Sequence, residues 1–379
     1  MNLLDSQNWK KIKEELFEKY VEKDIKEEVP IINGKLVDSK NWKEIKRYLP
    51  EEIKNERERL LNEAKKLYEN INLLGKMYDG LYKSRLSSLF GLPPPYLRCN
   101  ALMGIFAYLL GEKKEAEELY VKINQKFRVN KTTDKYNGLY KCGTTYREIL
   151  LSDNALMGIF LCLLGKKDEA EEVYKKINER FRDNEITSKY NGFYVLNENN
   201  PVLQLSSNAL MGIFLCLLRK EDEAKELYEK INERFKISDN SHEYKGMYLS
   251  TNISPAIYTI DNALMGIFLS LLGRKKEAIQ LYTNIKEKLK NEEGLYRYDS
   301  VNQSTIFLGA QVLVGILSCL IGRFGEAQAI FEKINEIFKG NKLYKQWIIG
   351  NDVLTYSNAL VGIFTFLLAS RGRKTLHNF

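Results

Sequence analysis

Hydrophobic and polar positions along the chain follow a pattern that repeats six times. The most apolar part of each copy approximates NALMGIF and recurs at spacings of 54, 54, 54, 49 and 47 residues. Each copy stays apolar on nearly all sides, which is typical of a helix buried all round. The sequence therefore predicts six inner helices, carrying CNALMGIF from Cys99, DNALMGIF from Asp153, SNALMGIF from Ser207, DNALMGIF from Asp261, AQVLVGIL from Ala310 and SNALVGIF from Ser357.

An amphipathic segment follows each inner helix except the last. A short turn such as Gly165-Lys-Lys-Asp joins the two, and glycine suits the left-handed position after a helix C-terminus. In the second copy, apolar residues recur at helical spacing between Glu169 and Phe181, with charged residues among them. One face of this segment is thus expected to be buried and the other solvated, as in an outer helix.

A third repeated element combines turn residues with aromatic residues, which indicates a short extended or hairpin segment. A polar loop then leads to the next inner helix. We call these elements the GLY segments: YDGLY from Tyr78, YNGLY from Tyr136, YNGFY from Tyr190, YKGMY from Tyr244, EEGLY from Glu292 and NKLY from Asn341.

The repeats are expected to close into a ring. An amphipathic helix near Glu51–Ile71 precedes the first GLY segment, so outer helices, GLY segments and inner helices each number six. An open solenoid needs polar terminal repeats, yet the final copy is as apolar as the middle ones. A tetratricopeptide-like solenoid is the alternative, but its unit has about 34 residues, some 20 fewer than here. We therefore predict an all-α fold, an (α/α)6 toroid over residues 51–370 with a tail at 371–379.

Residues 1–50 lie outside the repeat. DSQNWKKIK from Asp5 and DSKNWKEIK from Asp38 are near-copies, each with an Asp/Ser cap before a basic helix. Between them, Asn33-Gly34 predicts a hairpin turn. We expect an N-terminal extension of two short capped helices around this hairpin, with Trp9 and Trp42 anchoring it.

Composition narrows the range of functions. The net charge of +8 is spread over helix faces where Lys and Glu alternate, so we expect no nucleic-acid partner. No apolar run is long enough for a membrane span and the N-terminus lacks a signal peptide, so we expect a cytoplasmic protein without a membrane partner. The chain has only two histidines, His242 and His377, which disfavours a His-rich metal site. We expect no metal and no cofactor, and the sequence leaves the oligomeric state open.

Six helical hairpins whose GLY segments lead into DNALMGI-type inner helices resemble the six-hairpin (α/α)6 toroid superfamily. The resemblance covers residues 51–370 and lies in the architecture. It implies six-hairpin glycosidase-like enzymes, sugar epimerases and polysaccharide lyases and, more distantly, terpenoid cyclases and prenyltransferase-type rings. The chain lacks the DxDD motif of those cyclases, and neither histidine lies on an inner helix, as the zinc site of those transferases requires.

The long loops all precede inner helices, so in a ring they share one end, which we call the mouth. A residue present in every copy is expected to serve the repeat, whereas catalysis requires an asymmetric set. An amide at one position, Asn100 in the first copy, recurs in all six, and we interpret it as a structural cap that bridges neighbouring units; the lining of a polar pocket is the alternative. The residue before it varies, and it is aspartate at Asp153 and Asp261. These carboxylates are our candidate catalytic acid and base; helix capping is the alternative.

Other polar and aromatic residues of the long loops break the symmetry as well. Guanidinium groups pair with carboxylates, and aromatic rings stack on sugar faces. The candidate substrate-binding residues are Tyr96, Arg98, Tyr146, Arg147, Glu148, Tyr258, Phe307, Trp347, Asp352 and Tyr356.

Three functions remain open at this point. The first is a carbohydrate-processing enzyme, a hydrolase, lyase or epimerase, acting on an acidic or neutral sugar or oligosaccharide in the mouth. The second is a non-catalytic repeat scaffold that binds a partner. The third is isoprenoid chemistry in an aromatic-lined ring. We favour an enzyme of the first kind.

Overall fold

The computed structural model is mainly helical and divides into two units, Met1–Arg59 and Leu60–Phe379. It describes residues 31–32, 35–36, 42–86, 93–183, 185, 188, 190–197, 200–302, 304–348 and 352–370, and only the backbone of 31–53, 197, 200 and 201. The first expected helix with Trp9, the tail 371–379 and His377 therefore lie outside the described residues.

In the first unit, strands β1 (Ile31–Ile32) and β2 (Lys35–Leu36) pair antiparallel on the two sides of residues 33–34, where the sequence predicts a hairpin turn. The prediction of a second short helix after Asp38 is wrong. Helix α2 runs without interruption from Trp42 to Gly75 and so continues into the first outer helix. Pro50 lies inside it and removes one backbone hydrogen bond, but strong helix formers follow in EEIKNERERLL and sustain the helix.

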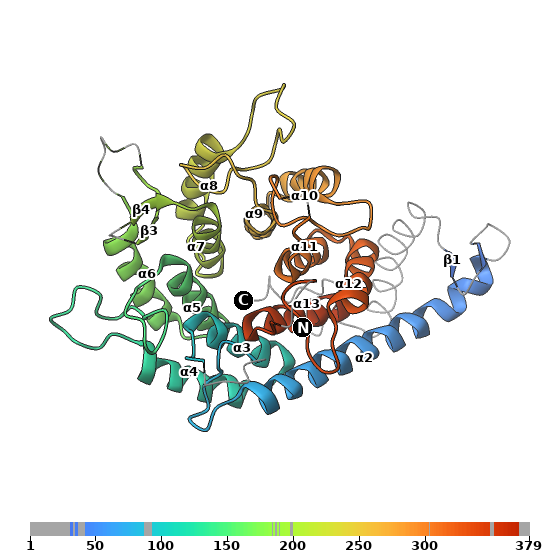
Figure 1. Ribbon diagram of the computed structural model, residues 1–379, viewed down its shortest axis with the longest axis horizontal. Helices are drawn as coiled ribbons and strands as arrows, with labels where there is room; N and C mark the ends of the chain where they lie inside the picture. Colours follow the sequence, from blue (N-terminus) through green and yellow to red (C-terminus); the bar gives the residue numbers. More distant parts are fainter. Residues whose placement is uncertain are drawn as a thin grey trace, which may run out of the picture. The chain divides into compact units, whose positions relative to one another are not determined.

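The second unit consists of helices in two concentric rings (Figure 1). The C-terminal part of α2 is the first outer helix. The other outer helices are α4 (Lys113–Phe127), α6 (Lys167–Phe181), α8 (Glu221–Phe235), α10 (Lys275–Leu289) and α12 (Phe324–Phe338). The inner helices are α3 (Leu97–Leu110), α5 (Leu151–Leu163), α7 (Leu205–Leu217), α9 (Thr259–Leu271), α11 (Leu308–Ile321) and α13 (Thr355–Ser370). A two-stranded hairpin, β3 (Val195–Asn197) with β4 (Asn200–Leu203), occupies the loop before α7.

The inner helices pack through a glycine on one helix and a large apolar residue on the next. The ring of Phe160 lies on Gly104, that of Phe214 lies on Gly158, and the pattern continues through every inner helix. Phe106 of the first inner helix lies on Gly362 of the last, so the ring is closed. Because the same two motif positions meet at each interface, the inner helices are parallel and in register.

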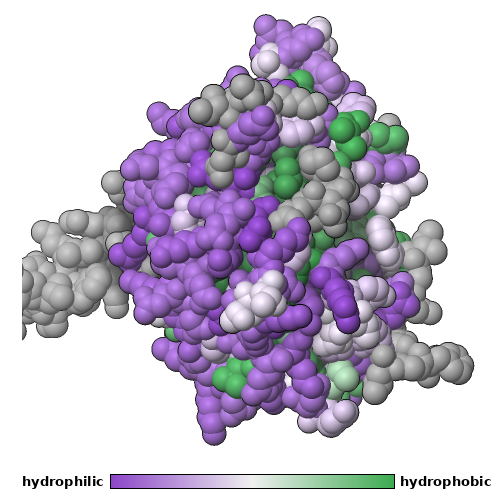
Figure 2. All heavy atoms as spheres, turned by 90° about the vertical axis from the view of Figure 1, so that its left-hand side faces the viewer, coloured by the Kyte–Doolittle hydropathy of each residue, from purple (hydrophilic) through white to green (hydrophobic). Residues whose placement is uncertain are grey.

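Closure also involves the outer helices and the loops. Lys339 at the end of α12 forms an ion pair with Glu63 on α2. The backbone N–H of Thr355, which begins α13, donates to the carbonyl of Ser84 at 3.1 Å. The expected toroid is therefore confirmed, and the outer helices turn their charged faces to solvent, as the largely hydrophilic surface in Figure 2 shows.

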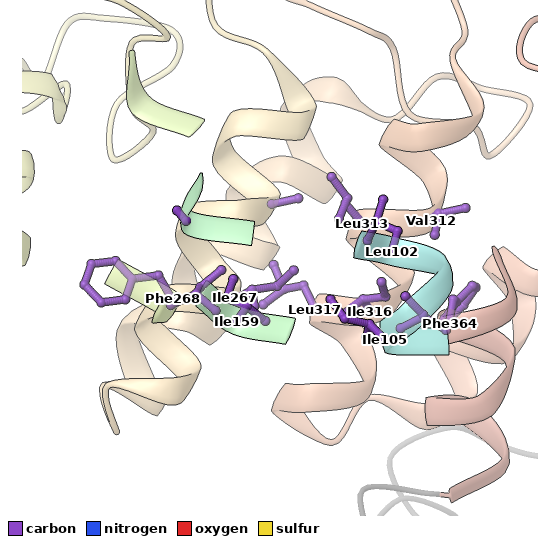
Figure 3. Packing of buried hydrophobic residues seen from close by; sticks show 14 of the residues in the cluster. Leu102, Ile105, Ile159, Ile267, Phe268, Val312, Leu313, Ile316, Leu317 and Phe364 are labelled. Carbon is purple, nitrogen blue, oxygen red and sulfur yellow. The ribbon is translucent and has the colours of Figure 1, made fainter. Parts of the chain in front are cut away.

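The centre of the ring is filled with aliphatic side chains. Motif positions spaced by i, i+3 and i+7, starting from Leu102, fall on one face of each helix. All six residues in the first layer are leucine, all six in the second are isoleucine, and all six in the third are leucine. In the isoleucine layer, Ile105 is 6% exposed and Ile159 is 8% exposed, and both lie between the inner helices (Figure 3). The ring is thus closed below the mouth.

A steric prediction follows from the glycine–phenylalanine contacts. A Cβ atom at Gly158 would lie 2.4 Å from Cζ of Phe214, whose side chain is fully buried. Gly158→Ala is therefore expected to lower the free energy of unfolding by about 1–3 kcal/mol, the usual effect of overpacking a core. Urea unfolding of Gly158→Ala, Phe214→Ala and the double variant should give effects that are less than additive, because Phe214→Ala removes the clash. Strict additivity would contradict this packing.

Candidate functional site

The six amides of the inner helices connect each helix to the GLY segment of its own unit. Asn208 accepts a hydrogen bond from the backbone N–H of Tyr194 at 3.0 Å and donates to the Tyr194 carbonyl at 2.9 Å. It also donates to the Gln204 carbonyl, one turn earlier in the helix. The Tyr194 hydroxyl donates to Asn178 on the outer helix. These fully buried amides serve the fold, as the sequence predicted, although they act within units and do not bridge neighbouring ones.

The mouth lies at the N-terminal ends of the inner helices. One turn before the Leu102 layer, the same helix face carries residues that differ between units. These are Arg98, Ser152, Ser206, Ile260, Gly309 and Tyr356. The symmetric aliphatic floor thus gives way to an asymmetric layer in which four of the six residues are polar, which is the arrangement expected where a specific ligand binds.

Asp153 lies in the first turn of α5 and pairs with Arg98 of the preceding unit. Nη2 of Arg98 lies 3.1 Å from Oδ1 of Asp153, and Nε donates to the same oxygen at 3.2 Å. The Asp153 side chain is only 3% exposed, whereas that of Arg98 is 47% exposed. Burial raises the pKa of Asp153, and Arg98 opposes this shift. Oδ2 of Asp153 is buried without a hydrogen-bond partner among the described residues.

Asp261 occupies the equivalent position on α9 and has different neighbours. Burial raises its pKa to about 6, and hydrogen bonds from the hydroxyls of Ser250 and Ser206 limit that rise. Ser206 stands where Arg98 stands beside Asp153, since each is at the same position of the preceding unit. The two aspartates therefore have contrasting environments: one faces a guanidinium and the other faces hydroxyls.

The capping interpretation of these aspartates is contradicted. The N-cap residues are Leu150 for α5 and Tyr258 for α9, and neither helix has a side-chain cap hydrogen bond. Both carboxyls instead point to neighbouring side chains. The first N–H of α9 donates to the carbonyl of Tyr298 in the next unit, which satisfies the helix end without a carboxylate.

Several candidate aromatic residues come together in two groups. Tyr96 and Tyr146 stack with ring centroids 5.7 Å apart, next to the unit that carries Asp153. On the side of Asp261, the ring centroid of Phe307 lies 4.8 Å from that of Trp347. Tyr298, which sequence reasoning missed, lies between Tyr258, Phe307 and Trp347 and joins them into one cluster.

Tyr356 lies between the two groups. Its hydroxyl accepts a hydrogen bond from Nε2 of Gln346 at 2.8 Å, and it is close enough to influence the pKa of both Arg98 and Tyr298. Gln346 is buried and also accepts a hydrogen bond from Ser357. Sequence reasoning missed Gln346 too; its signal was its position, two residues after the last tyrosine of a GLY segment.

Three of the candidate residues, Arg147, Glu148 and Asp352, join neither the Arg98–Asp153 pair nor the aromatic groups. Arg147 and Glu148 are exposed in the loop that follows Tyr146. Asp352 forms an ion pair with Arg85 at 3.7 Å, where the sixth unit meets the first.

Among the described residues, no three His, Cys, Asp or Glu side chains group in a way that could hold a metal ion. Cys142 lies near Asp153, but burial first and then the carboxyl charge raise the pKa of its thiol, so it is not an activated nucleophile. No described helix is both long and apolar enough to cross a membrane.

The raised pKa of Asp261 predicts a pH-dependent stability. The folded protein binds the Asp261 proton more tightly than the unfolded chain, whose aspartates titrate near 3.8. Stability is therefore lost as pH rises from about 4 to about 6, by about 3 kcal/mol for a shift of about two units. At pH 7, Asp261→Asn should unfold at a higher midpoint concentration of urea than wild type. Near pH 4 the two midpoints should be equal. An equal difference at both pH values would contradict the shift.

Comparison with known proteins places this arrangement in a wider group. No protein-family model matches the sequence, and no curated protein matches it either. Solved structures do match. The α-1,6-mannanase GH76A of Salegentibacter sp. HEL1_6 superimposes with a TM-score of 0.62 at 12% identity, over 82% of this chain and 99% of the mannanase. A variant of that mannanase with two adjacent aspartates replaced is inactive and was solved with α-1,6-mannotriose.

Two sugar-converting enzymes are also similar. A sugar epimerase from a ruminal bacterium matches with a TM-score of 0.63 at 11% identity, over 82% of this chain and 99% of the epimerase. A D-mannose isomerase matches with a TM-score of 0.66 at 11% identity, over 82% of this chain and 97% of the isomerase. At such identities the likeness concerns the fold, and it shows that this chain has the six-hairpin (α/α)6 toroid fold.

Proposed function

We propose that the protein is a carbohydrate-processing enzyme whose site is the mouth of the toroid. The observation that carries the proposal is the pair of buried aspartates at equivalent positions of α5 and α9 with contrasting partners. The preceding unit supplies a guanidinium to Asp153, whereas Asp261 binds one hydroxyl from the preceding unit, that of Ser206, and one from its own unit, that of Ser250. Two carboxyls whose environments differ can divide into an acid and a base, which glycoside chemistry requires.

Each aspartate then has a defined role. Asp261, with its pKa raised to about 6, is the general acid that protonates the departing oxygen of the sugar. Asp153 pairs with Arg98, which favours its carboxylate form against the effect of burial, and it acts as the base. Arg98 is half exposed, so it also contacts the substrate. Activity that depends on protonated Asp261 should fall as pH rises above about 6.

The aromatic groups provide the surfaces on which sugar rings stack. Tyr96 with Tyr146 lies on one side, and the cluster of Tyr258, Phe307 and Trp347 lies on the other. Similar folds in the mannanase, the epimerase and the isomerase support a sugar ligand. This chain has no two adjacent aspartates. Its carboxyl pair comes from separate helices, unlike the adjacent pair replaced in the inactive mannanase.

The aliphatic centre of the ring disfavours isoprenoid chemistry, which needs a deep aromatic-lined interior. The isoleucine layer is almost fully buried, so the space below the mouth is filled. Aromatic residues gather instead in the loops at the mouth, together with polar groups. A shallow polar and aromatic site is typical of a sugar site.

Incubation of the protein with neutral and acidic mono- and oligosaccharides tests the proposal and identifies the reaction. Hydrolysis adds water to the substrate, elimination creates an ultraviolet-absorbing double bond, and epimerisation leaves the mass unchanged but alters the proton NMR spectrum. We expect one of these products to form. Absence of turnover across the set, together with absence of sugar binding, would overturn the enzyme assignment and favour a non-catalytic scaffold.

A further inference from the structure

One position of the repeat has a constant backbone role and a variable side chain. It is the second residue after the last tyrosine of each GLY segment. In five units its carbonyl accepts the first N–H of the neighbouring inner helix, for example Leu97 to Cys142 at 2.9 Å and Thr259 to Tyr298 at 3.0 Å. The backbone meets the structural need of the repeat there, so the side chain is free to differ.

The side chains at this position differ in size and polarity, and only serine occurs twice. They are Ser84, Cys142, Leu196, Ser250, Tyr298 and Gln346. Three of them are already part of the site, because Ser250 bonds to Asp261, Gln346 bonds to Tyr356, and Cys142 lies near Asp153. Because five of these carbonyls bond to the N-termini of the inner helices, the side chains of those five residues border the mouth.

Tyr298 is the largest of the six and packs among three other aromatic rings. Its ring centroid lies 5.1 Å from that of Tyr258, 5.7 Å from that of Phe307 and 6.2 Å from that of Trp347. The side chain is half buried, and its hydroxyl has no hydrogen-bond partner among the described residues. Asp261 and Tyr356 are both close enough to act electrostatically on it. A rigid ring thus presents a free hydroxyl beside the candidate acid.

We propose that Tyr298 binds the substrate directly, donating a hydrogen bond from its hydroxyl to a hydroxyl of the sugar whose departing oxygen Asp261 protonates. This inference rests on the proposed function and adds to it the residue that selects the sugar. The aromatic neighbours fix the Tyr298 ring, so little conformational freedom is lost on binding. The other four side chains that border the mouth shape the rest of the border in the same way.

The test uses Tyr298→Phe, which keeps the aromatic packing and removes only the hydroxyl. Trp347 lies in the same cluster, so its fluorescence reports sugar binding once Trp9 and Trp42 are replaced by phenylalanine. The probes are α-1,6-mannotriose, maltotriose and trigalacturonic acid, titrated into the full chain. For any probe that binds, we expect the Kd to rise about three- to tenfold in Tyr298→Phe, as for one lost hydrogen bond. Tm should be unchanged.

Tyr108→Phe is the matched control, because Tyr108 lies in the last turn of α3, at the other end of the inner helix. It should bind each probe as tightly as wild type. If a probe binds Tyr298→Phe and wild type equally, the role of Tyr298 is overturned while the sugar site stands. If the wild type neither binds nor converts any sugar, the proposed function fails, and the Tyr298 assignment fails with it.

Discussion

Replacing Asp261 with asparagine is expected to lower kcat/KM on the sugar substrate by about 10²- to 10⁴-fold, the usual contribution of a general acid. Asparagine keeps the size of the side chain and its hydrogen bonds with Ser250 and Ser206, but it has no proton to give to a leaving group. The same change should stabilise the fold at pH 7, because it removes a buried carboxyl whose pKa is raised to about 6. Steady-state kinetics and urea unfolding of one preparation measure both effects.

Ser207→Ala provides the control for this variant. Ser207 occupies the position of Asp261 on α7 and is equally buried, but its hydroxyl donates to Gln204 and it has no acid function. Its replacement should leave kcat/KM within about twofold of wild type, as expected of a residue outside the chemistry. If Asp261→Asn kept full activity on a substrate that the wild type converts, Asp261 would not be the acid.

Replacing Asn208 with alanine is expected to lower the free energy of unfolding by about 3–5 kcal/mol. The change leaves the N–H and carbonyl of Tyr194 and the carbonyl of Gln204 without this partner in a fully buried place. Each buried polar group left unsatisfied costs about 1–3 kcal/mol. Chemical denaturation followed by circular dichroism measures the loss.

Asn178→Ala is the matched comparison, since Asn178 binds the same tyrosine at its hydroxyl alone, at 2.6 Å. Its loss removes the hydrogen bonds that it makes with the hydroxyls of Tyr194 and Tyr174 at the edge of the buried region, so it should cost about 1–2 kcal/mol. Equal losses for the two variants would contradict the view that the inner amide connects the GLY segment to its helix.

The ring was predictable from sequence because its determinants repeat. The NALMGIF motif specifies the apolar inner helix, and the Gly–Phe spacing within it determines how neighbouring helices pack. Six copies of the same interface between inner helices then close the ring, and no additional sequence signal is needed. The boundary at residue 50 was not predictable in the same way. The capping pattern at Asp38 indicated a separate short helix, whereas helix propensity on both sides of Pro50 joins the two segments.

The candidate site was only partly predictable. Asp153 and Asp261 could be found because they break the symmetry at a repeated position, and Arg98 could be found because it is charged next to an apolar motif. Tyr298 and Gln346 were missed because each follows a GLY segment and looks like another aromatic or polar loop residue. The importance of Tyr298, for example, depends on its contacts with Tyr258 and Trp347 in the two neighbouring units. A single sequence does not show such contacts until the register of the ring is known.

The central claim is that Asp153 and Asp261 flank a bound sugar. A crystal structure of Asp261→Asn soaked with mixed neutral and acidic oligosaccharides tests it most directly, because this variant should bind substrate without converting it. We expect sugar density at the mouth, in contact with Arg98 and Tyr298. It should lie between Asp153 and the substituted position 261. The claim would be contradicted if the mouth were empty after a soak at saturating sugar concentration, or if sugar density appeared only elsewhere on the protein.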